Sequence, residues 1–408
     1  MPRSFHHSLH FEYSLFPPKM RWLFIAHLLR GAAQQTVGLF IPIFLYLHAE
    51  TFPWWSLIPF SSQWGSLVRG VLIVCLYYIV MKSFEFFLAI PLSRVIKFLG
   101  LVKSMIVGNI VLLMFYAALS FTEVFPILFL LIPILSAIEI PLYWMSYHTL
   151  FAVNADMKLL GQEVGSFQFL DKLLRAALPM VGGVIAGVFG FQTLNIFGAI
   201  LIFGACIFLI PVHETILSFK VSWSEFFQWC TSLATRNVIF GFIGNTIDDI
   251  SREIWIVYVL IFFGTVERVG YAYSVVLFLS LFISYFMGWY LGKHKGKIAL
   301  VMSGGFMSVM WWLRMFIQSM WHFFAIDILD RLVVSVFVPI FDTFFYKASH
   351  GKMVFHFYVF REMIISLTSM LFWMTIGLFF ILPFQWIGVF ALASIGTLFS
   401  LHMAKDRE

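Results

Sequence analysis

The stretch Gly288-Trp-Tyr-Leu-Gly-Lys-His-Lys-Gly-Lys297 links two apolar runs, at 268–291 and 298–318, and shows the pattern that decides the fold. Each run is about as long as the ~20 apolar residues that a helix needs to cross a bilayer. The link is rich in lysine, and short loops of that kind stay on the cytoplasmic side of a membrane. The stretch therefore predicts two spanning helices joined by a cytoplasmic loop.

Further apolar runs of similar length extend this pattern over nearly the whole chain of 408 residues, which is 61% hydrophobic and 11% charged. The runs are too long for barrel strands and lack period-two alternation. The fold class is therefore an all-α polytopic membrane protein without a separate soluble domain. We expect twelve transmembrane helices, at 22–48, 66–92, 104–120, 124–151, 162–189, 191–211, 236–263, 268–291, 298–318, 322–348, 353–382 and 384–402.

The basic residues outside these runs are distributed unevenly. Of 17 such Lys and Arg residues, 16 lie in the tails or in alternate connections, and Arg268 is the exception. This distribution predicts an even number of spans, with both termini cytoplasmic. The net charge of +6 is expected to face anionic lipid headgroups and not nucleic acid. We expect a multi-pass monomer in the cytoplasmic (inner) membrane.

An internal repeat divides the chain into two parallel halves. The segment Pro141–His148 is echoed 198 residues later by Pro339–Tyr346, and two further landmarks repeat at an offset of 199. Two six-helix halves are an established transporter plan. We therefore predict a cytoplasmic tail at 1–21, a six-helix bundle at 22–212, a linker with an amphipathic helix at 213–235, a second bundle at 236–402 and a tail at 403–408.

Charged residues inside the spans are the best guide to function, because a charge at the bilayer centre costs about 3 kcal/mol on insertion scales. The third, sixth and twelfth spans have none and the ninth has only Arg314, so every third helix is expected to face lipid. Several charges have a partner of opposite sign at helical spacing. These pairs are Lys82–Glu85, Asp171–Arg175, Asp248–Arg252 and Asp327–Arg331.

The mid-span polar residues form the candidate substrate or proton site. Asn245, Asp249 and Arg252 share one face of the seventh span, and two adjacent acids beside one arginine could leave a carboxylate free to carry a proton. The alternative is that local pairs neutralise these charges permanently. The mixture of signs argues mildly against a purely cationic or purely anionic substrate. The candidates are Arg30, Gln34, Glu139, Tyr143, Asp171, Arg175, Asn245, Asp248, Asp249 and Arg252.

Two motifs carry a resemblance to a known family. The loop that opens this section is similar to the G-x-x-x-D-R-x-G-R-R signature of the major facilitator superfamily, although a glycine stands where the acid is usual. The fifth span, Pro179-Met-Val-Gly-Gly-Val-Ile-Ala-Gly187, resembles that family's G-P-x-x-G-G element. The residues concerned are Arg94, Gly288, Gly292, Lys293, Gly296 and Lys297 for the loop, and Pro179, Gly182, Gly183 and Gly187 for the helix-packing motif.

The resemblance implies a secondary transporter that moves a small molecule by alternating access, with protons as a candidate coupling ion and efflux as a candidate direction. In the family, the glycines help to seal the outer end of the pathway and the basic loop holds the inward gate closed. Residues 136–150 lack the arginine that many drug–proton antiporters carry in the fourth span. That coupling device is therefore not carried over.

Other classes of function are weighed against this one. The chain has no H-E-x-x-H or G-x-S-x-G motif, and its three cysteines have no metal-ligand spacing, so we expect neither an enzyme nor a bound metal or cofactor. A non-transporting receptor or assembly factor on a transporter scaffold stays open, because a fold does not name a function.

Overall fold

The computed structural model describes residues 21–51, 64–154, 173–174, 176–214, 220–291, 296–349 and 354–404, and the regular structure of these residues is helical throughout. Each expected span overlaps with a helix or with helical segments in succession, the fifth only at its described residues 173–174 and 176–189. Asp171, Arg175, Gly292 and Lys293 lie outside the described residues.

The first half contains the first six spans. The first span is α1 (Arg21–Thr36) and α2 (Ile41–Leu47), separated by a 3-10 turn at Gly38–Phe40. It is followed by α3 (Ser66–Leu99), α4 (Leu101–Ser120) and α5 (Leu128–Asn154). The described part of the fifth span ends in a π-helical turn at Ile185–Phe189, and the sixth span is α7 (Gly190–Leu209). Gly190 has a φ of 85°, which glycine adopts without strain at this break.

The second half follows a short helix, α8 (Trp223–Thr231), that begins with a capping box between Ser222 and Glu225. Its spans are α9 (Arg236–Phe263), α10 (Val266–Leu291) and α11 (Gly296–Leu313) with a 3-10 turn at Arg314–Phe316. They continue with α12 (Met320–Ser349), α13 (Val354–Ile381) and α14 (Gln385–Phe399), and a last 3-10 turn spans Ser400–Ala404.

The chain is a multi-pass membrane protein. Among the described residues, eight helical stretches are long and apolar enough to cross a bilayer. Helix α9 and the first part of α10 pass the same test only together, bent by 118° at their junction. Helix α12 has enough length, but it carries Asp327, Asp330 and Arg331 within one turn. One of the eight stretches, Ala176–Leu209, contains both the fifth and the sixth span, so nine of the twelve expected spans pass the test on their own.

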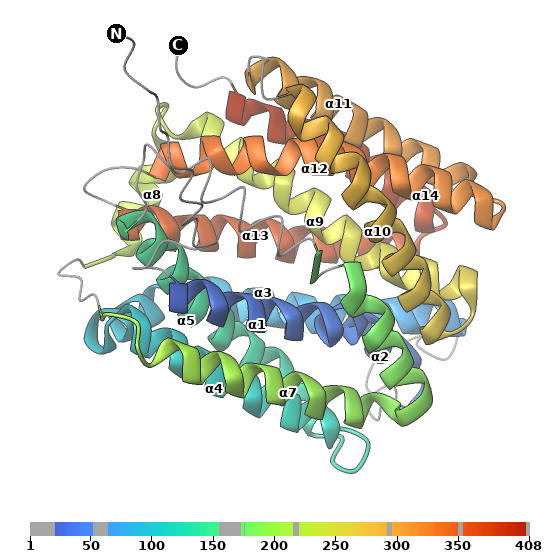
Figure 1. Ribbon diagram of the computed structural model, residues 1–408, viewed down its shortest axis with the longest axis horizontal. Helices are drawn as coiled ribbons and strands as arrows, with labels where there is room; N and C mark the ends of the chain where they lie inside the picture. Colours follow the sequence, from blue (N-terminus) through green and yellow to red (C-terminus); the bar gives the residue numbers. More distant parts are fainter. Residues whose placement is uncertain are drawn as a thin grey trace, which may run out of the picture.

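The two halves lie side by side, with α1–α7 forming one bundle and α9–α14 the other (Figure 1). The start of α1 and the end of the last described turn are at the same end of the bundle, which fits an even number of spans. We call this the basic end, because α3 finishes there with Arg94 and Lys97. The opposite end carries Glu50, Glu123 and the α9–α10 junction.

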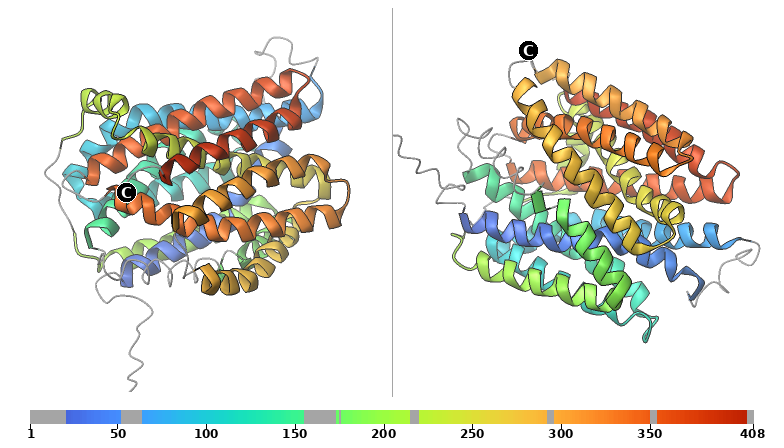
Figure 2. Two further views of the ribbon diagram at one scale, coloured as in Figure 1. Left: turned by 90° about the horizontal axis from the view of Figure 1, so that it is seen from above. Right: turned by 45° about the vertical axis from the view of Figure 1, so that its right-hand side comes forward.

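The charge-poor helices α4, α7, α11 and α14 pack chiefly against helices of their own half. On α7, the side chains of Ile196, Ile200 and Phe203 are between 55% and 65% exposed, as a lipid-facing row requires. The main contacts between the halves come instead from α3 with α13, α5 with α13, and α2 with α9. Figure 2 shows the same division from two further directions. These helices therefore lie away from the contact between the halves, and the expectation that every third span faces lipid stays a prediction.

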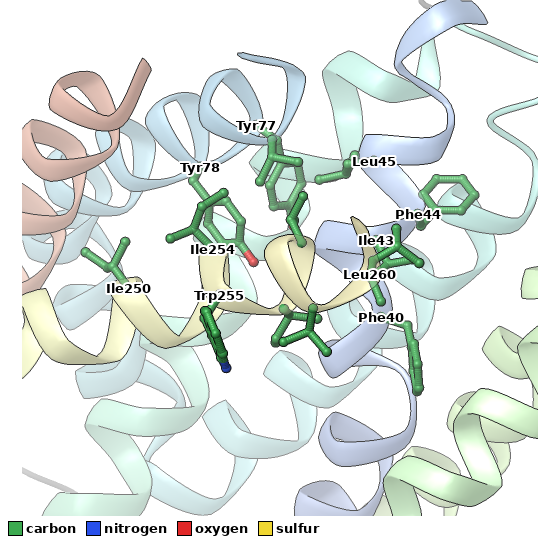
Figure 3. Packing of buried hydrophobic residues seen from close by; sticks show 14 of the residues in the cluster. Phe40, Ile43, Phe44, Leu45, Tyr77, Tyr78, Ile250, Ile254, Trp255 and Leu260 are labelled. Carbon is green, nitrogen blue, oxygen red and sulfur yellow. The ribbon is translucent and has the colours of Figure 1, made fainter. Parts of the chain in front are cut away.

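Buried apolar side chains of both halves merge towards the opposite end. Phe40 and Ile43 of the first span, Tyr78 of α3, and Trp255 and Leu260 of α9 belong to one cluster (Figure 3). Without a hydrophobic driving force in lipid, such contacts hold helices together by close van der Waals packing. The halves therefore form a single packed body.

The repeat is visible where the halves meet. His148 of α5 and Tyr346 of α12 occupy equivalent positions 198 residues apart, and His148 Nδ1 lies 3.2 Å from the Tyr346 hydroxyl. Equivalent residues of two repeats come into contact when they lie beside the pseudo-two-fold axis that relates the repeats. Both helices also carry an internal proline, Pro141 and Pro339. The domain boundaries proposed from the sequence stay a prediction.

Candidate functional site

Arg30 is the centre of a buried polar group in the first half. Its side chain is fully buried, and its Nη1 donates to Asn109 Oδ1 of α4 at 2.7 Å. Its Nη2 donates to the Glu139 carboxylate of α5, forming an ion pair. The guanidinium carbon also lies 3.9 Å from the centre of the Tyr143 ring. These contacts join α1, α4 and α5, and the buried charges compensate each other.

The candidate residues Glu139 and Tyr143 of α5 both contact Arg30, and further polar contacts continue towards the basic end. His27 Nδ1 is 3.1 Å from the Tyr143 hydroxyl, and the His27 ring stacks on Tyr147 at 4.0 Å between centres. Gln34 lies one turn beyond Arg30 on α1 and is half-buried. This part of the candidate site is a connected polar path inside the first half.

The second half contains a larger ionic network. Arg252 of α9 donates to Asp248 Oδ2 at 2.7 Å and also forms an ion pair with Asp330 of α12. Arg314, fully buried after α11, donates to Asp327 Oδ1 at 2.8 Å and to Asp330 Oδ2 at 3.0 Å. Asp330 therefore bridges two arginines, and the network ties α9, the turn after α11, and α12 together.

Asp248 is a structural member of this network. Besides Arg252, it accepts a hydrogen bond from Trp311 Nε1 at 2.8 Å, and Thr397 Oγ1 lies 3.4 Å away. The Arg314 guanidinium lies over the same Trp311 ring, 4.0 Å from its centre. A carboxylate held by these donors has its charge compensated, so the pairing of Asp248 with Arg252 is confirmed.

One expected pair is wrong. Asp327 binds Arg314 and not Arg331, although Arg331 stands four residues further along the same helix. Arg331 instead lies over the Tyr273 ring of α10, 5.8 Å from its centre. Arg314 reaches Asp327 from another helix, and a fully buried arginine needs that carboxylate more than a half-buried one does.

Asp249 differs from its neighbour because it is exposed although it lies halfway along α9. Its Oδ2 accepts a hydrogen bond from Asn245 Nδ2 at 2.9 Å. Asn245, Asp249 and Arg252 were expected to share one face of the seventh span, and Arg252 forms its ion pairs with Asp248 and Asp330. The two adjacent acids point to different surroundings, since consecutive helical residues face different directions.

A group of charges lies between the two halves. On α3, Lys82 Nζ donates to Glu85 Oε2 at 2.8 Å, as expected from their spacing; on α13, Arg361 Nη1 donates to Glu362 Oε1 at 2.6 Å. The charges of Lys82 and Glu85 act on both Glu253 and Glu362, those of Arg252 and Arg361 act on Asp249, and that of Arg361 also acts on Asp342. We call this group the acidic seam; it consists of Glu85, Asp249, Glu253, Asp342 and Glu362 with Lys82 and Arg361.

Most of the acidic seam was not singled out from the sequence. The sequence shows that these charged residues lie within spans, where a charge is energetically unfavourable. That they come together from α3, α9, α12 and α13 depends on the tertiary fold. Asn109 and Trp311 were also missed, because their spans, the third and the ninth, were expected to face lipid. A buried asparagine within the otherwise apolar run at 104–120 was the one available signal for Asn109.

The helix-packing motif lies at a close contact between the halves. A Cβ at Gly183 would lie 3.0 Å from the Gly270 Cα of α10, and one at Gly182 would lie 2.5 Å from the Thr36 carbonyl oxygen of α1. A Cβ at Gly187 would overlap the Glu267 side chain, and Pro179 has its carbonyl oxygen against Gly270. These glycines therefore permit the fifth span to touch α10 near the opposite end.

The loop motif is described only in part. Arg94 is exposed at the basic end of α3, Gly288 lies in α10, Gly296 opens α11, and Lys297 is exposed. In the first half the corresponding connection is a turn at Gly100, whose φ is 91°. Glu214 accepts hydrogen bonds there from the Val102 and Lys103 amides at 2.9 and 3.0 Å, which places an acid at the N-terminus of α4.

Comparisons with known proteins reveal likeness in structure alone. No protein-family model matches the chain, and a search of curated proteins finds no match. The structure is similar to that of the human organic anion transporter MFSD10, with a TM-score of 0.68, 13% identity, and coverage of 95% of this chain and 100% of that one. It is also similar to a bacterial homologue of the iron transporter ferroportin, with a TM-score of 0.64, 12% identity, and coverage of 93% and 98%.

A third similar structure is FucP of E. coli, solved as a major facilitator superfamily transporter in the outward conformation. Its TM-score is 0.63 at 11% identity, and the match covers 97% of this chain and 99% of that one. Identities this low show the arrangement of the helices and not the substrate. The twelve spans in two parallel halves, together with these three likenesses, identify the chain's fold as that of the major facilitator superfamily.

Proposed function

We propose that the protein is a secondary transporter that works by alternating access, with its substrate bound between the two halves. The observation that carries this proposal is the acidic seam, a group of charges midway along α3 and α9 and in the first third of α13, where the halves meet. Charges at that depth are too unfavourable to persist without partners, water or a ligand. Rocking of the halves about such a centre would open it to one end at a time.

Two contacts between the halves are suited to act as gates. At the opposite end, Gly183 and Gly270 allow the fifth span to touch α10, and the Met180 amide donates to Ser274 Oγ at 2.8 Å. Towards the basic end, His148 stacks on Tyr358 of α13 at 5.4 Å between ring centres. Each contact can separate while the other stays closed, which is what alternating access requires.

The buried networks and the acidic seam have different parts in the proposal. The Arg30–Glu139 pair and the network around Asp330 hold the helices of each half together as rigid units. Asp249, Asn245 and Gln34 bind substrate or proton, because they are the least buried of the mid-span candidates. Asp171 and Arg175 stay part of the proposed site. Proton coupling, if present, uses Asp249 and not Asp248, whose donors already compensate its charge.

Reactivity of a cysteine at position 249 tests the proposal without a known substrate. Asp249→Cys would be placed in a chain whose native Cys75, Cys206 and Cys230 are replaced by serine. In oriented vesicles, a membrane-impermeant maleimide is expected to label this cysteine from either side, because the site faces each side in turn. Labelling from one side alone would instead favour a non-transporting receptor on the same scaffold.

The orientation in the membrane is also part of the proposal, with both termini and the basic end in the cytoplasm. Single cysteines at Arg94 and Glu123, which are exposed at the two ends, are expected to react from opposite sides of intact inverted and right-side-out vesicles. The cysteine at position 94 should react from the cytoplasmic side. Reaction of both from one side would contradict the topology.

A further inference from the structure

Resting on the proposed function, we propose that the substrate is an organic cation with an apolar body, whose positive charge is held by the acidic seam. Leaving Asp342 aside, the described residues of the seam comprise four carboxylates and two basic side chains. A bound cation would offset part of this excess of negative charge. The sequence alone suggested no preferred sign, because all mid-span charges were considered together.

This excess of negative charge is not neutralised by three further arginines of the described spans, because each of them already has acidic partners. Arg30 binds Glu139 and Asn109, Arg252 binds Asp248 and Asp330, and Arg314 binds Asp327 and Asp330. Transferring any of these arginines to the seam would leave its own buried carboxylate unpaired, which is strongly unfavourable. A bound cation would balance the seam without breaking any of these pairs.

Glu85 provides a second, independent indication of a ligand. Its side chain is fully buried, and Lys82 bonds to Oε2. Its Oε1 has no hydrogen-bond donor among the described residues. A buried carboxylate oxygen without a donor is costly, and an ammonium or guanidinium group would supply the missing donor. Glu253 and Glu362 lie within electrostatic reach of Glu85, so such a group would meet more than one carboxylate.

The surroundings favour an organic cation over a metal ion. Among the described residues, no three Asp, Glu, His or Cys side chains are grouped closely enough to hold a metal. Next to the seam, Tyr78 of α3 and Trp373 of α13 stack with parallel rings, 4.4 Å between centres, and Tyr78 is within electrostatic reach of Glu253. Aromatic faces beside carboxylates suit a cation with apolar groups attached.

Binding of three probes with one shape and different charge tests the inference. Tetraphenylphosphonium is a cation, tetraphenylborate is its anionic counterpart, and triphenylphosphine oxide is a neutral relative. Equilibrium binding to the purified full-length protein in detergent is expected to favour the cation by at least about tenfold over the other two. Equal or tighter binding of the neutral or anionic probe would overturn the inference.

Variants locate the bound cation. Glu85→Gln and Asp249→Asn are each expected to weaken tetraphenylphosphonium binding by about tenfold, because each removes one negative charge. Glu123→Gln, an equal change at an exposed position of the opposite end, should leave it unchanged. Asp249 is exposed, so its variant keeps the test valid if Glu85→Gln fails to fold. Unchanged affinity in Asp249→Asn would overturn the assignment to the seam.

The two proposals fail in different ways. Labelling of Asp249→Cys from both sides requires no substrate, so it reports on alternating access alone. Labelling from both sides without a binding preference for the cation would refute the proposed substrate class but not the proposal that the protein is a transporter. Labelling from one side alone, together with tight binding of the cation, would refute the proposal of transport and would support a cation-binding receptor.

Discussion

Replacing Arg30 by leucine is expected to destabilise the protein by about 3–5 kcal/mol, because Glu139 would remain buried without its partner. The effect should be large because Arg30 is fully buried and Glu139 is 4% exposed. The unfolding temperature of the purified protein in detergent measures the loss. The double variant Arg30→Leu with Glu139→Leu should recover most of it, since it removes both charges together.

The exposed pair of His48 and Glu123 provides the matched control. Glu123 has 69% of its side chain exposed, so Glu123→Gln should change the unfolding temperature little. A double variant no more stable than Arg30→Leu alone would show that the pair is stabilising in itself. That result would contradict the view that each charge is kept mainly to compensate the other.

Replacing Gly183 by leucine is expected to hold the opposite end open. The Cβ alone would lie 3.0 Å from Gly270 Cα, and the rest of the side chain has to enter the same contact. Overpacking of this kind costs about 1–3 kcal/mol, which shifts the equilibrium about five- to hundredfold away from the closed arrangement. In the single-cysteine protein with Asp249→Cys, labelling from the basic end should fall by that factor while labelling from the opposite end persists.

Gly305→Leu is the control for this variant. A Cβ at Gly305 in α11 would meet no atom within 4 Å, so the same substitution should leave the labelling pattern unchanged. Equal labelling rates from the basic end in Gly183→Leu and Gly305→Leu would show that the fifth span does not gate the opposite end.

The spans were predictable because the bilayer sets their length and requires the backbone to satisfy its own hydrogen bonds. The run at 353–382 became α13, Val354–Ile381, and the run at 236–263 became α9, Arg236–Phe263. The interruption of the first span by a turn at Gly38–Phe40 was not foreseen, although Pro42 near the start of α2 marks it. Local breaks of this kind have little effect on the hydropathy of a run.

The candidate site was predictable as a set of residues and not as a set of contacts. Spacing along one helix correctly paired Lys82 with Glu85 and Asp248 with Arg252. The same reasoning failed for Asp327, because its partner Arg314 comes from another helix. The separation of Asp248 from Asp249 into a bonded and an exposed acid also depends on neighbouring helices. A sequence lists the charges, but their division among partners is decided by helix packing.

Locking the opposite end closed tests alternating access most directly. A Cβ at Gly187 would meet the Glu267 side chain, so Gly187→Cys and Glu267→Cys are chosen to form a disulfide across the halves. The disulfide would be formed in a protein that also carries Asp249→Cys. Labelling of the cysteine at position 249 by an impermeant maleimide would be measured after the disulfide has formed, and again after the disulfide has been reduced and the reductant removed. The account predicts labelling from the basic end alone while the disulfide is present, and from both ends after reduction. Labelling from the opposite end that is equally fast with and without the disulfide would contradict it.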